Sequence, residues 1–288
     1  MVLYILYRIG YFLVNVLPLK AAYGLASFIA GLCYMIQRGD RAAVIKNLRT
    51  IVLPAPGEPE LRRMARELYR NFAKYLVDFF RFSKIDEEYV NRFVKVEGRH
   101  NIDSALAKKC GAVLVSAHIG NWELGGSAIS LLGYPMSAVV LTHRNKKIDA
   151  FFRRQRLRGK LTPIEIGASL KACYHILKSN RLLGLLGDRD FTGNGLMLDF
   201  FGKKTLFPKG PSVFGYRLGA PLIPTLIIRR PDDTFCLSFE EPIYADRSKP
   251  EDAAVMELAG KCAAIIETYV RRYPTQWYIF KDMWSKDE

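Results

Sequence analysis

The sequence lacks most of the short motifs that mark well-known enzyme classes. It contains no G-x-S-x-G nucleophile elbow, no Walker A phosphate loop, no G-x-G-x-x-G fingerprint and no H-E-x-x-H motif. Its five cysteines include no C-x-x-C pair, and four of them stand in apolar surroundings. This usage is typical of reduced thiols in a cytoplasmic setting. We therefore expect no metal and no resident cofactor.

Acidic residues are few relative to basic ones. The chain has 28 Asp and Glu against 43 Lys and Arg, which gives a formal net charge of +15. Such an excess predicts an anionic partner, which is a nucleic acid, an acidic protein or the negative surface of a membrane. With 288 residues, half of them hydrophobic, the chain can form one large domain or a domain with an appended segment.

Charge is almost absent from residues 1–37, where only Arg8 and Lys20 are charged. The 17 residues from Ala21 to Gln37 carry no charge and are at the short limit for a membrane-spanning helix. We predict that 1–37 is a membrane-attachment segment that spans the bilayer or lies in its plane; the alternative is a buried core hairpin. No small-residue cleavage site follows a short apolar stretch, so a removed signal peptide is not expected.

A basic amphipathic helix is predicted over residues 59–82, where apolar residues recur at helical spacing between arginines and lysines. Such a helix either lies on an anionic bilayer or belongs to a domain and exposes its charged face to water. We assign it to a second unit, residues 38–288.

From about residue 93 the chain alternates short apolar runs with helical stretches. This alternation predicts an α/β domain with a largely parallel central sheet flanked by helices. The expected strands are 93–97, 112–117, 137–142, 182–187, 221–228 and 235–239, and the expected helices are 121–132, 145–159, 168–179, 209–218 and 250–272.

Reactive residues follow three of the expected strands at the point where each strand ends. His118 follows the first, His143 and Arg144 the second, and Asp188-Arg189-Asp190 the third. Ligands of open α/β sheets bind at the carboxyl ends of the strands. If the three strands are neighbours, these groups converge on one cleft.

The most informative pair is His118 and Glu123. Asn121 is a good helix N-cap, which places Glu123 in the first helical turn, facing back toward the strand end that carries His118. In one interpretation His118 is a general base oriented by Glu123. In the other, Asn121 caps the helix, Glu123 compensates its dipole and His118 bonds to backbone. The strand-end position favours the first.

The other strand-end residues have two interpretations each. Arg144 could hold a phosphate or stabilise an oxyanion, or it begins the solvated basic run that continues to Lys160. That run is also the best argument in the chain for nucleic-acid binding. Asp188 and Asp190 could bind a metal, although a loop stabilised by Arg189 is the commoner arrangement.

Three segments resemble the lipid A late acyltransferase family of lauroyl and myristoyl transferases, which includes the phosphatidylinositol mannoside acyltransferases. They are AHIGNWE at 117–123, GDRD at 187–190 and DFFGKKTLFPKGPSVFGYRLGAPLIP at 199–224. The resemblance implies an enzyme of the inner membrane, with its active site on the cytoplasmic side. It would move a fatty acyl group from a thioester of acyl carrier protein or coenzyme A to a hydroxyl of a glycolipid such as a lipid A precursor. The expected partners are these substrates and the anionic membrane, and not nucleic acid.

The same resemblance implies roles for individual residues. His118 matches the catalytic histidine, Glu123 its acidic partner, Arg144 an arginine after the next strand, and Asp188 or Asp190 an acidic residue of the third block. The wider glycerolipid acyltransferases carry Asn and Glu where this chain has Ala117 and Lys209, which favours a glycolipid acceptor over a glycerol phosphate.

Under this hypothesis His118, steadied by Glu123, takes the proton of the acceptor hydroxyl as the oxygen attacks the thioester carbonyl. Arg144 and backbone amides near Gly120 are the candidates to stabilise the tetrahedral intermediate. Two other classes stay open. One is a non-catalytic basic protein that binds anionic membrane or RNA through residues 144–160 and 59–82, and the other is a membrane-bound hydrolase that uses the same pair to activate water. Within the enzyme interpretation, a phosphatidylinositol mannoside-type acyltransferase is the alternative to lipid A.

Overall fold

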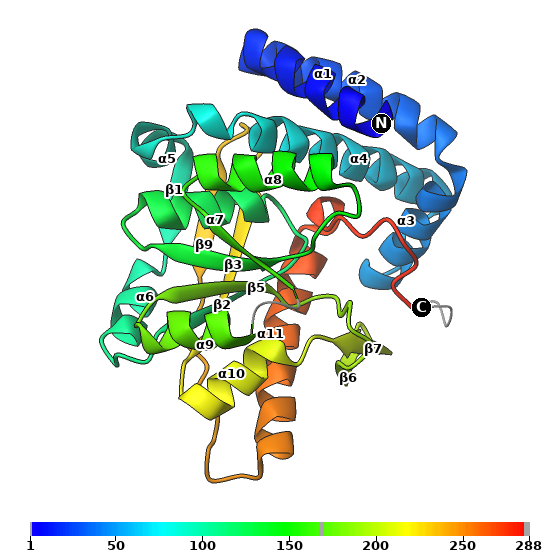
Figure 1. Cartoon of the computed structure of the whole chain (residues 1–288). Coiled ribbons are helices and arrows are strands. Elements are labelled where there is room, and N and C mark those ends of the chain that lie inside the picture. The colour runs from blue at the N-terminus through cyan, green and yellow to red at the C-terminus, as the bar shows by residue number, and fades with distance from the viewer. Residues whose placement is uncertain (1, 167–169, 285–288) are drawn as a thin grey trace.

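A seven-stranded sheet forms the centre of the computed structural model, which describes residues 2–166 and 170–284 (Figure 1). The strand order is β1 (Val94–Glu97), β9 (Phe235–Phe239), β8 (Leu222–Arg229), β2 (Ala112–Ser116), β5 (Leu182–Leu186), β3 (Met136–Val140) and β4 (Thr162–Glu165). Neighbouring strands are parallel except β8 and β9. The predicted α/β fold with a largely parallel sheet is confirmed.

Strand β2 shows why the sheet lies in the interior. Its residues from Ala112 to Val115 are all buried, as expected when both faces of a parallel strand are covered. Val113 and Val115 pack into the core with α9 (Leu170–Lys178), α10 (Gly210–Leu218) and α11 (Glu251–Arg272). Ala112 and Leu114 pack on the opposite face with α6 (Arg99–Leu106), α7 (Trp122–Leu131) and α8 (Lys146–Arg158).

The predicted elements agree with the observed ones to within about two residues where both are described. The first two residues of the predicted helix 168–179 lie outside the described residues. The prediction missed several short elements, whose brevity leaves little periodic signal. They are α5 (Glu87–Phe93), α6, β4 and the antiparallel ribbon of β6 (Leu196–Phe200) and β7 (Lys203–Phe207).

The first four helices of the chain precede α5 and the first strand, and they lie outside the sheet (Figure 1). They are α1 (Val2–Val16), α2 (Leu19–Ile36), α3 (Arg38–Ile51) and α4 (Glu58–Phe80). The predicted amphipathic helix is α4, and its apolar residues, among them Leu61, Leu68 and Phe79, are buried. The apolar face of α4 therefore packs within the protein, and the interpretation as a domain helix is correct.

Helices α1 and α2 keep much of their apolar surface exposed. On α2, Ala22, Tyr23, Ala30 and Tyr34 are buried, whereas the outward side chains include Phe28, which is 67% exposed. Leu3, Ile5, Leu6, Ile9, Phe12, Val16, Leu32, Met35 and Ile36 are exposed as well. Within the described part of the chain, α2 is the one helix long and apolar enough to cross a membrane.

Candidate active site

A cavity of about 300 Å³ lies between the sheet and helices α7 and α8. It reaches from His118, just beyond β2, back along the sheet to Leu114 and Gly184 in the middle of β2 and β5. Leu, Ile, Met, Ala and Gly form most of its wall. Strands β2, β5 and β3 are adjacent, so the condition under which the three reactive strand ends converge is met.

His118 is held at this strand end by a buried carboxylate. Its Nδ1 lies 2.8 Å from Asp188 Oδ1, and its backbone N–H donates to Asp188 Oδ2 at 2.9 Å. The indole N–H of Trp277 donates to the same Oδ2 at 3.0 Å. The Asp188 side chain is fully buried, whereas that of His118 is 20% exposed. The pairing thus joins the ends of two neighbouring strands.

Asp188 is ionised in this setting. Burial alone would raise the pKa of its carboxyl group, but the His118 ring, the Trp277 indole and the His118 backbone N–H together hold that pKa below its ordinary value. A carboxylate only accepts hydrogen bonds, so His118 Nδ1 carries the proton. In the neutral imidazole Nε2 then carries the lone pair, and His118 lines the cavity. This is the tautomer that a general base requires.

Among the residues described, no hydrogen bond joins Glu123 to His118, whose ring bonds Asp188 instead, so the predicted pairing of the two is not formed. The Glu123 carboxylate accepts from Arg156 of α8, at 3.0 and 2.6 Å from Nε and Nη2 to Oε1 and at 3.1 Å from Nε to Oε2. Both side chains are almost buried, and both line the cavity. Glu123, in the first turn of α7, extends toward α8. Among the residues described, Arg156 of α8 is the only buried cation that lines the cavity, and it is the partner of Glu123.

The loop between His118 and α7 is fixed by its backbone. Gly120 has φ +62°, and a Cβ there would come within 1.7 Å of the carbonyl oxygen of Ile227, so only glycine fits. Its N–H donates to the carbonyl of Gln276 at 2.9 Å. This amide is therefore committed to another partner, so among the amides near Gly120 it is not the one available to an oxyanion. The predicted N-cap is confirmed, because Asn121 Oδ1 accepts the N–H of Leu124 at 3.1 Å.

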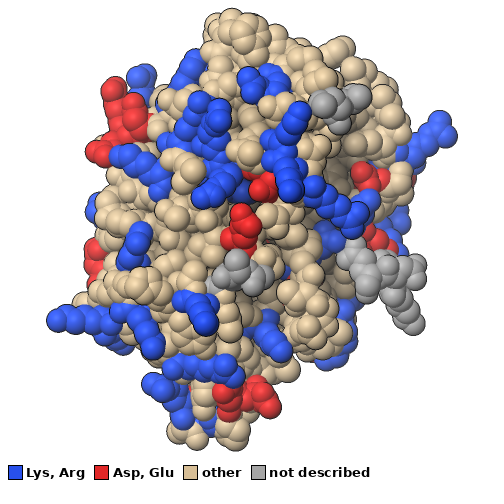
Figure 2. Space-filling view, in the orientation of Figure 1, with Lys and Arg blue, Asp and Glu red and all other residues tan. Residues whose placement is uncertain are grey.

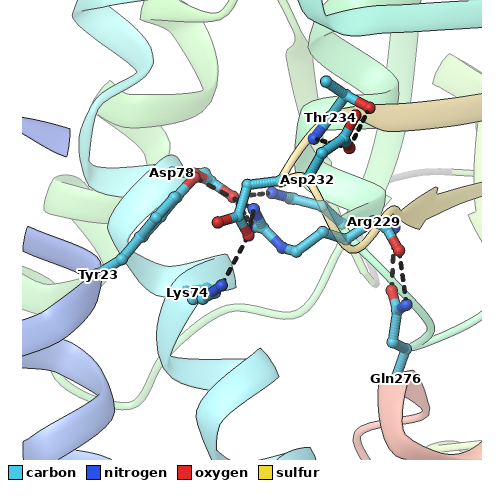
Figure 3. A network of polar contacts seen from close by, with 9 residues as sticks. Tyr23, Lys74, Asp78, Arg229, Asp232, Thr234 and Gln276 are labelled. Carbon is cyan, nitrogen blue, oxygen red and sulfur yellow. Dashed lines mark hydrogen bonds and ion pairs between the residues drawn. The ribbon is translucent and has the colours of Figure 1, made fainter. Parts of the chain in front are cut away.

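A buried polar network behind this loop connects it to the N-terminal helices (Figure 3). Asn121 donates to Asp78 of α4 at 2.8 Å, and Asp78 also pairs with Arg229 and accepts from the Tyr23 hydroxyl of α2. The Gln276 side chain bonds both the N–H and the carbonyl of Arg229. The network therefore holds the loop after His118 from two sides.

The remaining predicted residues separate into two groups. Arg189 lines the cavity, with its guanidinium 5.0 Å from the Phe191 ring centroid. Asp190 bonds Thr192 of its own loop. Arg144 is exposed and is not among the residues that line the cavity, although its neighbour His143 is. The structure thus brings Asp188 and Arg189 to His118 and leaves Arg144 outside.

Sequence reasoning missed Arg156, Tyr75 and Trp277. Arg156 stands in the basic run of α8, where Lys146, Lys147, Arg153, Arg154, Arg158 and Lys160 are exposed as expected; Figure 2 shows Lys and Arg side chains gathered over this region. Its spacing of four residues from Phe152 placed it on the buried face. No comparable signal marks Trp277, which reaches Asp188 from a segment 89 residues away.

No group of three or more potential metal ligands occurs among residues 2–166 and 170–284. The side chains at the strand ends are instead committed to one another as acid–base pairs. Such a site can hold and move a proton beside an apolar cavity.

Comparison with known proteins shows which family the chain is similar to. The family model described as bacterial lipid A biosynthesis acyltransferase matches residues 1–286. The chain is 28% identical over 290 residues to a phosphatidylinositol mannoside acyltransferase of Mycolicibacterium smegmatis, covering 98% of this chain and 91% of that protein. It is 27% identical to one from Mycobacterium tuberculosis, covering 98% and 88%. It is also 24% identical over 234 residues to the lipid A biosynthesis palmitoleoyltransferase of Escherichia coli, covering 81% and 74%.

Proposed function

Because the chain belongs to the bacterial lipid A biosynthesis acyltransferase family, and is therefore an acyltransferase, we propose that it transfers a fatty acyl group from a thioester to a hydroxyl of a glycolipid. The observation that carries the proposal is the bond of 2.8 Å between His118 Nδ1 and the buried Asp188 at an apolar cavity. It supplies a base for a hydroxyl beside a space suited to a hydrocarbon chain.

In the proposed reaction His118 Nε2 removes the acceptor proton while the hydroxyl oxygen forms a bond to the thioester carbonyl carbon. The tetrahedral intermediate collapses, the carbon–sulfur bond breaks, and the thiolate leaves with the proton that His118 had accepted. Asp188 stabilises the imidazolium that forms in between. Arg189, which lines the cavity together with Arg156, is our candidate to stabilise the developing oxyanion, because Arg156 is paired with Glu123.

Glu123 lines the cavity and is paired with Arg156, so we assign it no part in the proton transfer. The pair holds α7 to α8 above the acyl cavity, so Glu123 acts on the reaction by positioning. The apolar lining disfavours hydrolysis as the main reaction, because it excludes water from the surroundings of the bound thioester. Family membership likewise places the chain among enzymes and not among binding-only basic proteins.

The acceptor class rests on the relatives, whose names cite phosphatidylinositol mannoside and lipid A. Both acceptors are glycolipids. The donor is a thioester of acyl carrier protein or of coenzyme A, and the basic surface of α8 (Figure 2) suits the acidic surface of the first and the phosphates of the second. We place the enzyme at the inner membrane, attached through residues 1–37, with its active site facing the cytoplasm.

The test is a matrix of donors and acceptors. Detergent-solubilised protein is incubated with acyl thioesters of both carriers and with either a lipid A precursor or a phosphatidylinositol mannoside, and products are identified by mass spectrometry. We expect one acceptor to gain one acyl ester, and the His118→Ala variant to make none. Turnover retained by that variant would remove His118 from the mechanism, and free fatty acid as the main product would identify a hydrolase.

A further inference from the structure

A second cavity, of about 490 Å³, lies between α1, α2 and α4. Its volume is within the range of about 300–1,000 Å³ that is usual for ligand sites. It exists because α2 presents alanines to α4 at four-residue spacing, namely Ala22, Ala26 and Ala30. Small side chains on one helix face leave a groove that α1 covers in part.

One end of this cavity is polar. Tyr69 of α4 lines it and is only 4% exposed, and its hydroxyl has no hydrogen-bond partner among the described residues. Buried hydroxyl groups are normally bonded. Asp40 lines the same end and pairs with Lys281 at 3.0 Å. The cavity is thus amphiphilic, apolar along α1 and polar where α2 meets α3.

Positive charge surrounds the polar end. The ring of Tyr34, which contacts the Tyr69 ring at 5.5 Å between centroids, has the guanidinium of Arg41 at 5.3 Å and that of Arg66 at 5.4 Å from its own centroid. Two arginines beside an apolar channel complement a lipid with an anionic headgroup.

An aromatic wall separates this cavity from the active site. Phe72 lines the second cavity and stacks on Tyr75 at 5.5 Å between centroids, and Tyr75 stacks on Trp122 at 4.4 Å. Tyr75 and Trp122 line the catalytic cavity. An acyl chain in the second cavity is therefore separated from the space that holds the chain for transfer.

We infer that the second cavity binds one acyl chain of an anionic phospholipid of the bilayer, with the headgroup near Arg41 and Arg66. The inference rests on the proposed membrane attachment of residues 1–37, since α1 and α2 must lie in or on lipid for such a chain to enter. The exposed apolar side chains of the same two helices, such as Phe12 and Phe28, place that surface against the bilayer. The bound lipid would stabilise the packing of α2 on α4. This packing lies on the opposite side of the Phe72–Tyr75–Trp122 stack from the catalytic cavity.

The test uses a phosphatidylglycerol probe with a photoreactive diazirine in one acyl chain. It is mixed with the full-length protein in detergent micelles, irradiated, and mapped to peptides by mass spectrometry. We expect labelling of α4 around Phe72–Val77. Ala26→Phe, which fills the cavity, should reduce that labelling at least tenfold, whereas Ala21→Phe on the exposed face of the same helix should leave it unchanged.

Labelling confined to outward residues such as Phe28, or equal in both variants, would overturn the inference. Because Ala26→Phe could unfold the protein, its melting temperature is measured first, and Ala73→Leu on the α4 side serves as a second cavity-filling variant. Vesicle flotation is measured in parallel. Protein that floats without labelling α4 refutes the cavity site alone, and protein that does not float refutes the membrane attachment.

The headgroup is tested with a phosphatidylcholine probe of the same chain. Weaker labelling of α4 by this zwitterionic probe is expected, and the difference should vanish in the Arg41→Gln, Arg66→Gln double variant. Equal labelling by both probes in the unsubstituted protein would contradict the anionic preference.

Discussion

Two pairs of oppositely charged or titratable side chains lie at the same cavity, and they differ in the elements that they connect. His118 and Asp188 connect two neighbouring strand ends 70 residues apart, and the histidine keeps one nitrogen toward the cavity. Glu123 and Arg156 connect two helices, and every bond described for the carboxylate goes to the arginine. The first pair is arranged to exchange a proton, and the second to hold the wall in place. Nearness in sequence placed Glu123 at the site but gave the wrong partner.

Substitutions of His118 and Asp188 should have the largest effect on acyl transfer. His118→Ala should lower acyl transfer by about 10³–10⁴-fold, and Asp188→Asn by at least about 100-fold, because the amide no longer holds the required tautomer. Transfer is measured as product formed per minute with saturating donor. Asp190→Asn is the matched control, since Asp190 bonds Thr192 and not His118. If Asp188→Asn were as active as that control, the two pairs would not differ as described.

The second pair should respond mainly in stability. Arg156→Ala leaves Glu123 buried without its cation and should lower the free energy of unfolding by about 3–5 kcal/mol. The Glu123→Gln, Arg156→Met double variant removes both charges and should recover part of the loss. Arg154→Ala, on the exposed face of α8, should change stability by less than about 0.5 kcal/mol. Denaturant unfolding measures all three. A stable Arg156→Ala protein that had lost transfer would instead give Arg156 a direct catalytic role.

The volume of the cavity can be reduced without changing either pair. Ala138 lies beside Gly184 in the pairing of β3 with β5 and lines the catalytic cavity. Ala138→Phe should shift donor preference toward shorter acyl chains, with about a tenfold change in the ratio of rates for long and short thioesters, because the aromatic ring occupies hydrocarbon space. Competition between two chain lengths in one reaction measures this ratio. Ala150→Phe, exposed on α8, should leave it unchanged.

The smallest expected effect is on acid stability. The folded-state pKa of Asp188 is below its unfolded value, so its stabilisation is complete above the unfolded carboxyl pKa of about 3.9 and is lost as pH falls through the lower folded value. Unfolding free energy measured between pH 6 and pH 2.5 should therefore decline more gradually in Asp188→Asn than in the unsubstituted protein. Parallel curves would show that the buried carboxylate is not ionised.

Most of the sheet could be predicted from sequence, because a parallel strand that is buried on both faces has a continuous run of apolar residues. The runs 112–117, 137–142 and 182–187 each end at a reactive residue, and that boundary is a local signal. The order of these strands is not local. Nothing in the residues around Asp188 states that β5 lies beside β2, and this adjacency decides that His118 meets Asp188 and not Glu123.

The residues that were misplaced share a physical cause. Arg144 and Arg156 belong to one basic stretch, but Arg156 is on the buried face of α8 and pairs with Glu123, whereas Arg144, ahead of α8, is exposed. Backbone amides near Gly120 were candidates to stabilise the tetrahedral intermediate, but the amide of Gly120 itself bonds the carbonyl of Gln276, which is distant in sequence. Residue type and spacing identify the chemistry that is available, whereas tertiary packing decides which groups are already committed.

The bond from Tyr23 to Asp78 has a practical consequence for producing the enzyme. A chain shortened to begin after residue 37, the usual route to a soluble form, would lose that hydroxyl and uncover the side of α4 on which α2 packs. Asp78 also bonds Asn121, three residues beyond His118. Removing residues 1–37 would thus loosen the loop after His118, so protein that keeps them, in detergent or nanodiscs, is the form suited to crystallisation and assay.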